Sequence, residues 1–196
     1  MQSTTRRAWI VTLGVSTLLP ALAVESLLFR HENDFLRVTA PRLQFLSGAP
    51  LNRLLNGSTV LYLFQVSLSR DSFATVERRS LDRFALSYDL REERFAVTRI
   101  GLARESASQL PASAVQAWCV EKLQLPIAGL PRDVDYWVRL DVRAEDTRSP
   151  GDSLFDVPPL TWTRLIDLFS KPTRADSPKY TLEAGPVRFN TAGLQR

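Results

Sequence analysis

The stretch STVLYLFQVSLS, residues 58–69, alternates apolar and polar side chains, and it decides the fold class of this 196-residue chain. One parity is apolar throughout: Val60, Tyr62, Phe64, Val66 and Leu68. The other parity is polar apart from Leu61 and Leu63. A period of two with β-branched and aromatic residues is typical of a β-strand. We therefore predict a strand that is buried on one face and partly buried on the other.

Further strands follow from the same periodicity. DYWVRLDVRAED, residues 135–146, places Tyr136, Val138, Leu140 and Val142 on one face and Trp137, Arg139, Asp141 and Arg143 on the other. This predicts a strand with one solvated face, on which alternating Arg and Asp pair with neighbouring strands. Weaker strands are predicted at 35–39, 81–88, 95–101 and 180–189, the last with a bend or bulge at Gly185-Pro186.

Three short helices are predicted between the strands, at 49–56, 111–123 and 162–169. Strands outnumber helices, and no regular strand–helix alternation is visible. This favours a mainly β fold, an antiparallel β-sandwich with two or three short helices in its connections. Residues 144–159 and 170–179 are rich in proline, serine and charge and are predicted to be loops.

The N-terminus has the pattern of a secretion signal. Arg6 and Arg7 precede an apolar run from Ala8 to Leu19, and Ala21-Leu22-Ala23 supplies small residues for cleavage. The run is short for a membrane span. We predict a cleavable signal peptide over 1–23, a flexible segment over 24–34 and a single β-rich domain over 35–196. The expected location is secreted or periplasmic, with no transmembrane span in the mature chain.

Charge and composition narrow the function classes. The formal net charge of +4 falls to +2 once Arg6 and Arg7 are removed with the signal peptide. Such a small charge gives weak steering toward nucleic acid, so we expect no nucleic-acid partner. The single cysteine, Cys119, excludes an intramolecular disulfide. Together with the single histidine, His31, it cannot build a His/Cys zinc site, and a Ser-His-Asp triad would have to use His31.

The most charged stretch is SYDLREERFAVTR, residues 87–99. It predicts a hairpin in which Tyr88 and Phe95 anchor two strands and Asp89 caps the turn. The alternative is an anion site made by Arg91, Arg94 and Arg99. The hairpin is favoured because Glu92 and Glu93 neutralise the neighbouring arginines.

Three runs carry a resemblance to a known family. They are GAPLNRLLNGSTVLYLFQVSLSRD, ALSYDLREERFAVTR and GLPRDVDYWVRLDVRAED, and the resemblance covers about residues 35–146. With the leader, they resemble the bacterial domain-of-unknown-function family 4390. The shared features fall on Leu51 to Gly57, Tyr88-Asp89 and Tyr136 to Leu140. The resemblance implies an exported protein of unknown activity, and it brings no catalytic residue.

Several residues could take part in catalysis or metal binding, but for each of them a purely structural role is also possible. His31 follows the leader between acids and is predicted to lie in the flexible segment. Cys119 is predicted to be a buried small hydrophobe. The carboxylate pairs, Asp133/Asp135, Glu145/Asp146 and Asp152/Asp156, lack the pattern of a calcium loop. No catalytic, cofactor-binding or metal site is assigned, and no cofactor is expected. The stripe of Trp162, Leu165, Ile166 and Phe169 could bind a membrane or a partner, but packing on its own sheet is favoured.

The sequence therefore predicts an exported, non-enzymatic envelope-accessory or protein-interaction domain. Its partner would be a protein, reached through a strand edge or the loops at 89–94 and 146–159. The alternative is a carrier of a small apolar ligand or lipid, based on Leu61 and Leu63. An enzyme would require His31, or a carboxylate pair, to lie in a cleft.

Overall fold

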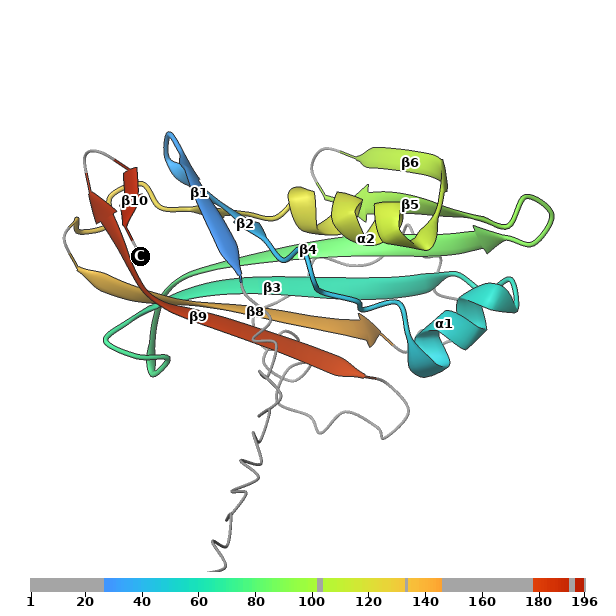
Figure 1. Cartoon of the computed structure of the whole chain (residues 1–196), viewed down its shortest axis with the longest axis horizontal. Helices are drawn as coiled ribbons and strands as arrows, with labels where there is room; N and C mark the ends of the chain where they lie inside the picture. The colour runs from blue at the N-terminus through green and yellow to red at the C-terminus, as the bar shows by residue number, and fades with distance from the viewer. Residues whose placement is uncertain (1–26, 102–103, 133, 146–177, 191–192, 196) are drawn as a thin grey trace, which may run out of the picture.

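A computed structural model describes residues 27–101, 104–132, 134–145, 178–190 and 193–195. Its largest element is a seven-stranded sheet in which every pair of neighbours is antiparallel (Figure 1). The strand order is β10 (Gly193–Gln195), β9 (Lys179–Asn190), β8 (Asp135–Glu145), β3 (Val60–Arg70), β4 (Thr75–Asp89), β5 (Arg94–Ile100) and β6 (Glu105–Leu110). The predicted strand at 58–69 is thus the centre of the sheet.

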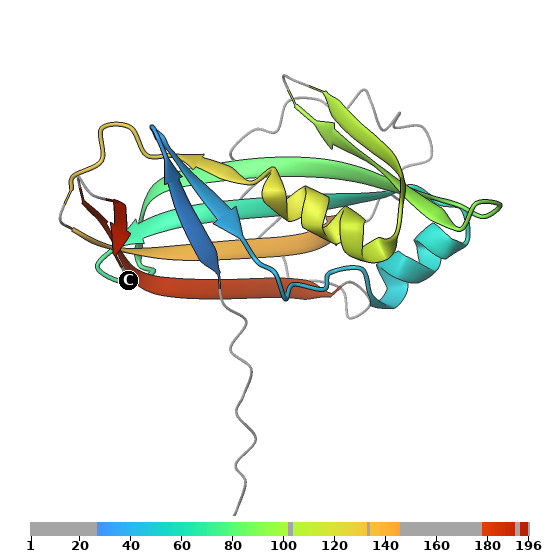
Figure 2. The same cartoon turned by 45° about the horizontal axis from the view of Figure 1, so that its top comes forward.

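A second layer covers one face of this sheet. It consists of a three-stranded antiparallel sheet, β1 (Leu28–Glu32), β2 (Phe35–Thr39) and β7 (Gln124–Pro126), together with α2 (Ala112–Glu121). Figure 2 shows the β1–β2 hairpin and α2 side by side over the long strands. The remaining helix, α1 (Gly48–Leu55), lies at the end of the sheet near the β4–β5 turn. Gly57, at φ +79°, follows α1 and lets the chain turn into β3.

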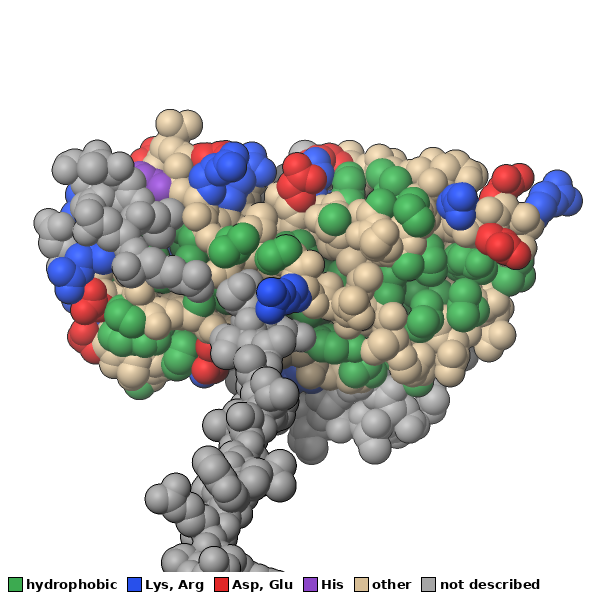
Figure 3. Space-filling view, in the orientation of Figure 1, with side chains coloured by type: hydrophobic (Ala, Val, Ile, Leu, Met, Phe, Trp, Pro, Cys, Tyr) green, Lys and Arg blue, Asp and Glu red, His purple; other side chains and the backbone are tan. Residues whose placement is uncertain are grey.

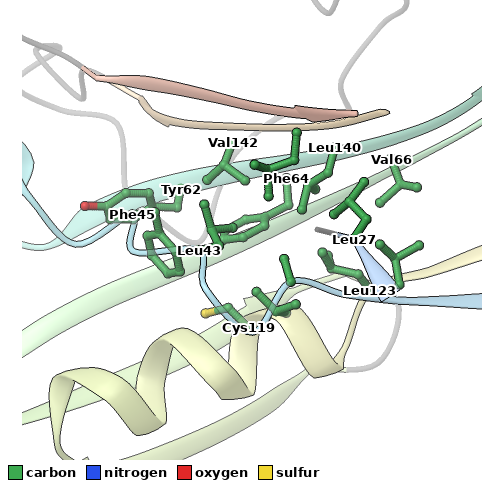
Figure 4. Packing of buried hydrophobic residues seen from close by; sticks show 14 of the residues in the cluster. Leu27, Leu43, Phe45, Tyr62, Phe64, Val66, Cys119, Leu123, Leu140 and Val142 are labelled. Carbon is green, nitrogen blue, oxygen red and sulfur yellow. The ribbon is translucent and has the colours of Figure 1, made fainter. Parts of the chain in front are cut away.

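The hydrophobic core lies between the two layers. The apolar parity of β3 faces it, and Tyr62, Phe64 and Leu68 are at most 1% exposed. Phe45 packs edge-on against Tyr62 and Phe64, with ring centroids 4.9 and 5.1 Å apart. Figure 4 shows these rings, with Cys119 of α2 on the opposite side of the cluster. Apolar area is therefore removed from water on facing sides of both layers, which is the main stabilising contribution.

The prediction of a mainly β fold with antiparallel sheets and short helices is confirmed. The predicted helices at 49–56 and 111–123 correspond to α1 and α2, whereas 162–169 and the loop at 146–159 lie outside the described residues. The predicted irregularity at Gly185 is also confirmed. A register shift interrupts the β8–β9 ladder between Tyr136 and Val138, and Trp137 packs directly over Gly185.

Two expectations were wrong. The segment 24–34 was predicted to be flexible, but Leu28–Glu32 forms β1 and pairs with β2 along its whole length. The reason is that Phe29 packs against the core while Leu36 and Val38 of β2 are buried. The outer face of 135–146 was predicted to be solvated, but Asp141 and Arg143 are only 6% and 7% exposed.

Candidate functional site

The charged stretch at 87–99 forms the predicted hairpin and not an anion site. Asp89 Oδ1 accepts hydrogen bonds from the backbone N–H groups of Arg91 and Glu92 at 2.9 and 3.1 Å, which caps the turn. Tyr88 and Phe95 pair across the strands, with ring centroids 4.8 Å apart. Arg99 lies at the other end of β5, where it bonds Asp82, so the hairpin does not gather the three arginines.

His31 lies on β1 and is exposed, with its ring centroid 6.3 Å from that of Phe189. A hollow of about 80 Å³ beside it is also lined by Asp34, Arg132 and Leu130. Cys119 lies on α2 inside the core, on a different element, so the structure does not bring the two residues together as nucleophile and base. Within the described part of the chain, no group of three His, Cys, Asp or Glu side chains could hold a metal ion.

Burial governs the chemistry of Cys119. The side chain is fully buried, and desolvation raises the pKa of its thiol far above the ordinary value. The thiolate is the reactive species, so the folded protein is expected to react with Ellman's reagent only through unfolding. Absorbance should show slow labelling in buffer and rapid labelling in concentrated guanidinium chloride. An Ala117→Cys variant in a Cys119→Ala background is the control, because Ala117 is exposed on the same helix and should label at once.

The candidate acids are held in ion pairs. Asp135 accepts bonds from Arg188 at 2.8 and 2.7 Å, and the hydrogen bond from Arg188 lowers the pKa of this carboxyl. Arg139 pairs with Glu183 at 2.6 Å. The predicted pairing of β8 charges with a neighbouring strand is therefore confirmed, and that strand is β9. Asp133, Asp146, Asp152 and Asp156 lie outside the described residues.

A further candidate feature is the edge strand β6. Within the described part of the chain it is the last strand on its side of the seven-stranded sheet (Figures 1 and 2). Ser106, Ser108 and Gln109 are exposed, and the strand carries no charge after Glu105. A bulge places Ser108 and Gln109 opposite the single residue Ala96, with Gln109 at φ +61°.

A hollow of about 280 Å³ near the bulge is lined by residues of β4, β5 and β6. Tyr88 and Phe95 line it together with Ser108 and Gln109. We call β6 and this hollow the β6 edge site. Hydrophobic side chains gather on the surface at this end of the molecule, where α1 and the β4–β5 hairpin lie (Figure 3). Leu90, 62% exposed, projects from the hairpin next to Gly57, and Leu55 of α1 is 40% exposed.

A partly buried ion network holds β6 in place. Arg99 donates from Nη2 and Nε to Asp82 Oδ1 at 2.7 and 2.9 Å, and its Nη1 lies 3.5 Å from Glu105 of β6. Glu105 also accepts a hydrogen bond from Lys122, which follows α2, and this bond lowers the pKa of the Glu105 carboxyl. Burial raises the pKa of Asp82 and outweighs the lowering by Arg99. The network therefore joins β4, β5, β6 and the end of α2.

A second concave feature lies between α2 and the segment that follows β2. This groove has a volume of about 340 Å³ and is lined by Ala40, Leu43, Ala117 and Val120, with Gln116 and Glu121 among its polar residues. Gln116 is held there by the backbone N–H of Leu46, which donates to its Oε1 at 3.1 Å. The groove is open to the surface, whereas Leu61 and Leu63, which suggested a ligand cavity, are buried on the opposite face of the large sheet.

No family model, curated protein or solved structure matches the chain. No helix among the described residues is both long and apolar enough to cross a membrane.

Proposed function

We propose that the protein is an exported, non-enzymatic interaction domain that binds an extended segment of an envelope protein at the β6 edge site. The leader pattern of residues 1–23 supports export. The observation that carries the binding proposal is the outer edge of β6, which pairs with no further strand among the described residues and carries no charged side chain from Ser106 to Leu110.

The physical basis is strand addition. An edge strand presents unpaired backbone N–H and C=O groups, and natural proteins commonly shield such edges with lysine, proline or a covering element. The exposed residues Ser106 and Ser108 are small and uncharged, so a second backbone can approach. The bulge limits the regular edge to a few residues, which restricts open-ended pairing between copies of the chain.

The hollow beside the bulge provides selectivity. In strand addition, backbone hydrogen bonds supply affinity and pockets for alternate side chains supply specificity. The aromatic side chains of Tyr88 and Phe95 line the hollow together with the charged side chains of Asp89 and Arg94. These residues favour a segment that inserts one apolar side chain beside the edge.

The proposal is tested by site-specific photocrosslinking in the organism that encodes the protein. A benzoylphenylalanine at Ser106 is expected to form a crosslink with a distinct envelope protein, identified by mass spectrometry. A second substitution, Ser108→Lys, should reduce that crosslink at least about tenfold, because it places a strongly hydrated charge at the edge.

Arg42 is the matched control position, since it is exposed on the segment after β2 and far from β6 in sequence. The same probe at Arg42 should not capture the same protein. Equal capture from both positions, or a crosslink unaffected by Ser108→Lys, would contradict binding at the β6 edge site.

The alternative of a lipid or apolar-ligand carrier is supported by the groove between α2 and Leu43. Organic extraction of the purified protein, followed by mass spectrometry, separates the two functions. A single lipid species present in equal molar amount with the protein, and lost in an Ala117→Glu variant, would favour the carrier.

A further inference from the structure

The turn that joins α1 to β3 contains the dipeptide Asn56-Gly57. Both residues are exposed, so water reaches the Asn56 side chain. Deamidation is fastest where glycine follows asparagine, because glycine has no side chain that hinders attack by its own backbone nitrogen. The other asparagines of the sequence, Asn33, Asn52 and Asn190, are each followed by a larger residue. The turn therefore combines the most labile dipeptide of the chain with access to water.

Deamidation of this dipeptide proceeds in two steps and consumes one molecule of water. The backbone nitrogen of Gly57 loses its proton and attacks Cγ of Asn56, the bond from Cγ to the side-chain nitrogen breaks, and ammonia leaves. The product is a cyclic succinimide, which water then opens at either carbonyl to give aspartate or isoaspartate. Ring closure requires that the Gly57 N–H be free and that this nitrogen lie on the same side of the Asn56 Cα–C bond as Cβ.

The folded turn meets neither requirement. The backbone N–H of Gly57 donates to the carbonyl of Leu54 at 2.9 Å. The backbone N–H of Ser58 donates to the carbonyl of Arg53 at 3.0 Å. With Gly57 at φ +79°, these two bonds form a Schellman motif that closes the C-terminus of α1. Asn56 has a ψ of 15°, which places the Gly57 nitrogen close to the backbone nitrogen of Asn56 and away from its Cβ. The ring can therefore close only after the motif opens.

A single side chain anchors the last turn of α1 in the core. Leu54 is fully buried, whereas Leu55 and Asn56 are exposed. Helix ends with few buried contacts open locally at a smaller free-energy cost than the strands of a core. The Schellman motif can therefore open while the large sheet stays folded, and the burial of Leu54 sets how often this happens.

We propose that Asn56 is a deamidation site, which the Schellman motif protects and which local opening of α1 makes reactive. In the isoaspartate product the backbone runs through Cβ of residue 56, so the path from α1 to Gly57 is longer. The N–H groups of Gly57 and Ser58 then no longer match the carbonyls of the last helical turn, and the motif cannot re-form. Each opening that leads to reaction thus leaves a lasting change in the turn before the central strand. This inference does not depend on binding at the β6 edge site.

Peptide mass spectrometry tests the site on the purified protein, incubated at mildly alkaline pH in water enriched in heavy oxygen. The product retains the heavy oxygen, which distinguishes it from deamidation during a later digestion in ordinary water. Trypsin separates Asn56, in the peptide 54–70, from Asn52, in the peptide 43–53. We expect Asn56 to react at least about tenfold more slowly in the folded protein than in guanidinium chloride. Asn52, which precedes Arg53, is the internal control and should react at least about tenfold more slowly than Asn56 in guanidinium chloride.

Two matched variants separate local opening of α1 from global unfolding. Leu54→Ala removes the anchor of α1 and should speed the reaction of Asn56 in the folded protein by at least about threefold. Leu68→Ala makes the same change at a fully buried position near the opposite end of β3, and it should leave the rate unchanged. Equal rates for Asn56 in the folded and unfolded protein, no reaction of Asn56 in guanidinium chloride, or equal acceleration by the two variants would overturn the proposal.

Discussion

Substitution of Phe64 by alanine is expected to lower the free energy of unfolding by about 3–5 kcal/mol. Phe64 is fully buried at the centre of β3. Its ring centroid lies 5.1 Å from those of Phe45 and Phe84, and both contacts are edge-on. Removing the ring loses its transfer free energy and leaves a cavity that neighbours on three different segments cannot easily fill.

Denaturant unfolding followed by circular dichroism measures this loss. The variants can be compared directly if the slope of the unfolding free energy against denaturant concentration does not change. Phe35→Ala is the matched control, because Phe35 is 42% exposed on the outer side of β2. The control should change stability by no more than about 0.5–1 kcal/mol. Similar losses for the two variants would mean that the core does not lie between the two layers.

The substitution Arg99→Met is expected to lower the free energy of unfolding by a comparable amount, about 3–5 kcal/mol, because it removes the charge that pairs with Asp82. Arg99 is the partner of Asp82, which is 8% exposed on the core side of β4. Without the guanidinium, a carboxylate whose pKa burial already raises stays behind with no cation in hydrogen-bond contact. The double variant Asp82→Leu/Arg99→Met should recover most of the loss, since it removes both charges and keeps their volume.

The pH dependence of this variant separates charge from packing. A carboxyl whose pKa is raised in the folded state binds a proton more readily there than in the unfolded chain. In the Arg99→Met variant, the unpaired Asp82 carboxylate therefore destabilises the folded state at pH values above its raised pKa. This destabilisation disappears as the pH falls below that pKa and the carboxyl takes up a proton. The stability difference between the parent protein and Arg99→Met should shrink from pH 7 toward acid. A difference that stays constant with pH would show that lost packing, and not the charge of Asp82, causes the effect.

The sequence predicted the long strands because each of them repeats one pattern over many residues. The apolar parity of 60–68 identifies β3 as central, and Leu61 and Leu63 correctly indicated burial on its second face. Asp89 predicted the turn because its side chain can bond the backbone two residues on, which is a local interaction.

The short elements could not be predicted in this way. β6, with the sequence ESASQL, is built from small polar residues that have no strong strand preference, and it is held by pairing with β5 and by the bonds of Glu105. β7 covers three residues and β1 five, and both become strands because β2 lies between them. Their conformation is set by neighbours distant in the sequence.

The candidate sites also divide into residues that the local sequence pointed to and residues that only the tertiary structure brought together. The sequence singled out His31, Cys119 and the arginines at 91, 94 and 99. His31 lies on β1 and Cys119 on α2, while Arg94 and Arg99 lie at opposite ends of β5. It gave no reason to group Gln65 with Arg79 and Arg83. These residues share one face of the sheet because β3 and β4 pair in one register, and a shift of one residue would turn the arginines to the core.

By itself, the sequence determined the mainly β class, the long strands, the two helices and the capped hairpin, because alternation and capping act over a few neighbouring residues. The tertiary structure decided which strands lie at the edges, which polar side chains are buried, and which charges meet. These properties depend on the register and layering of segments up to more than one hundred residues apart in the sequence. For example, β3 and β9 lie in one sheet because both pair with β8. No local pattern in the chain encodes them.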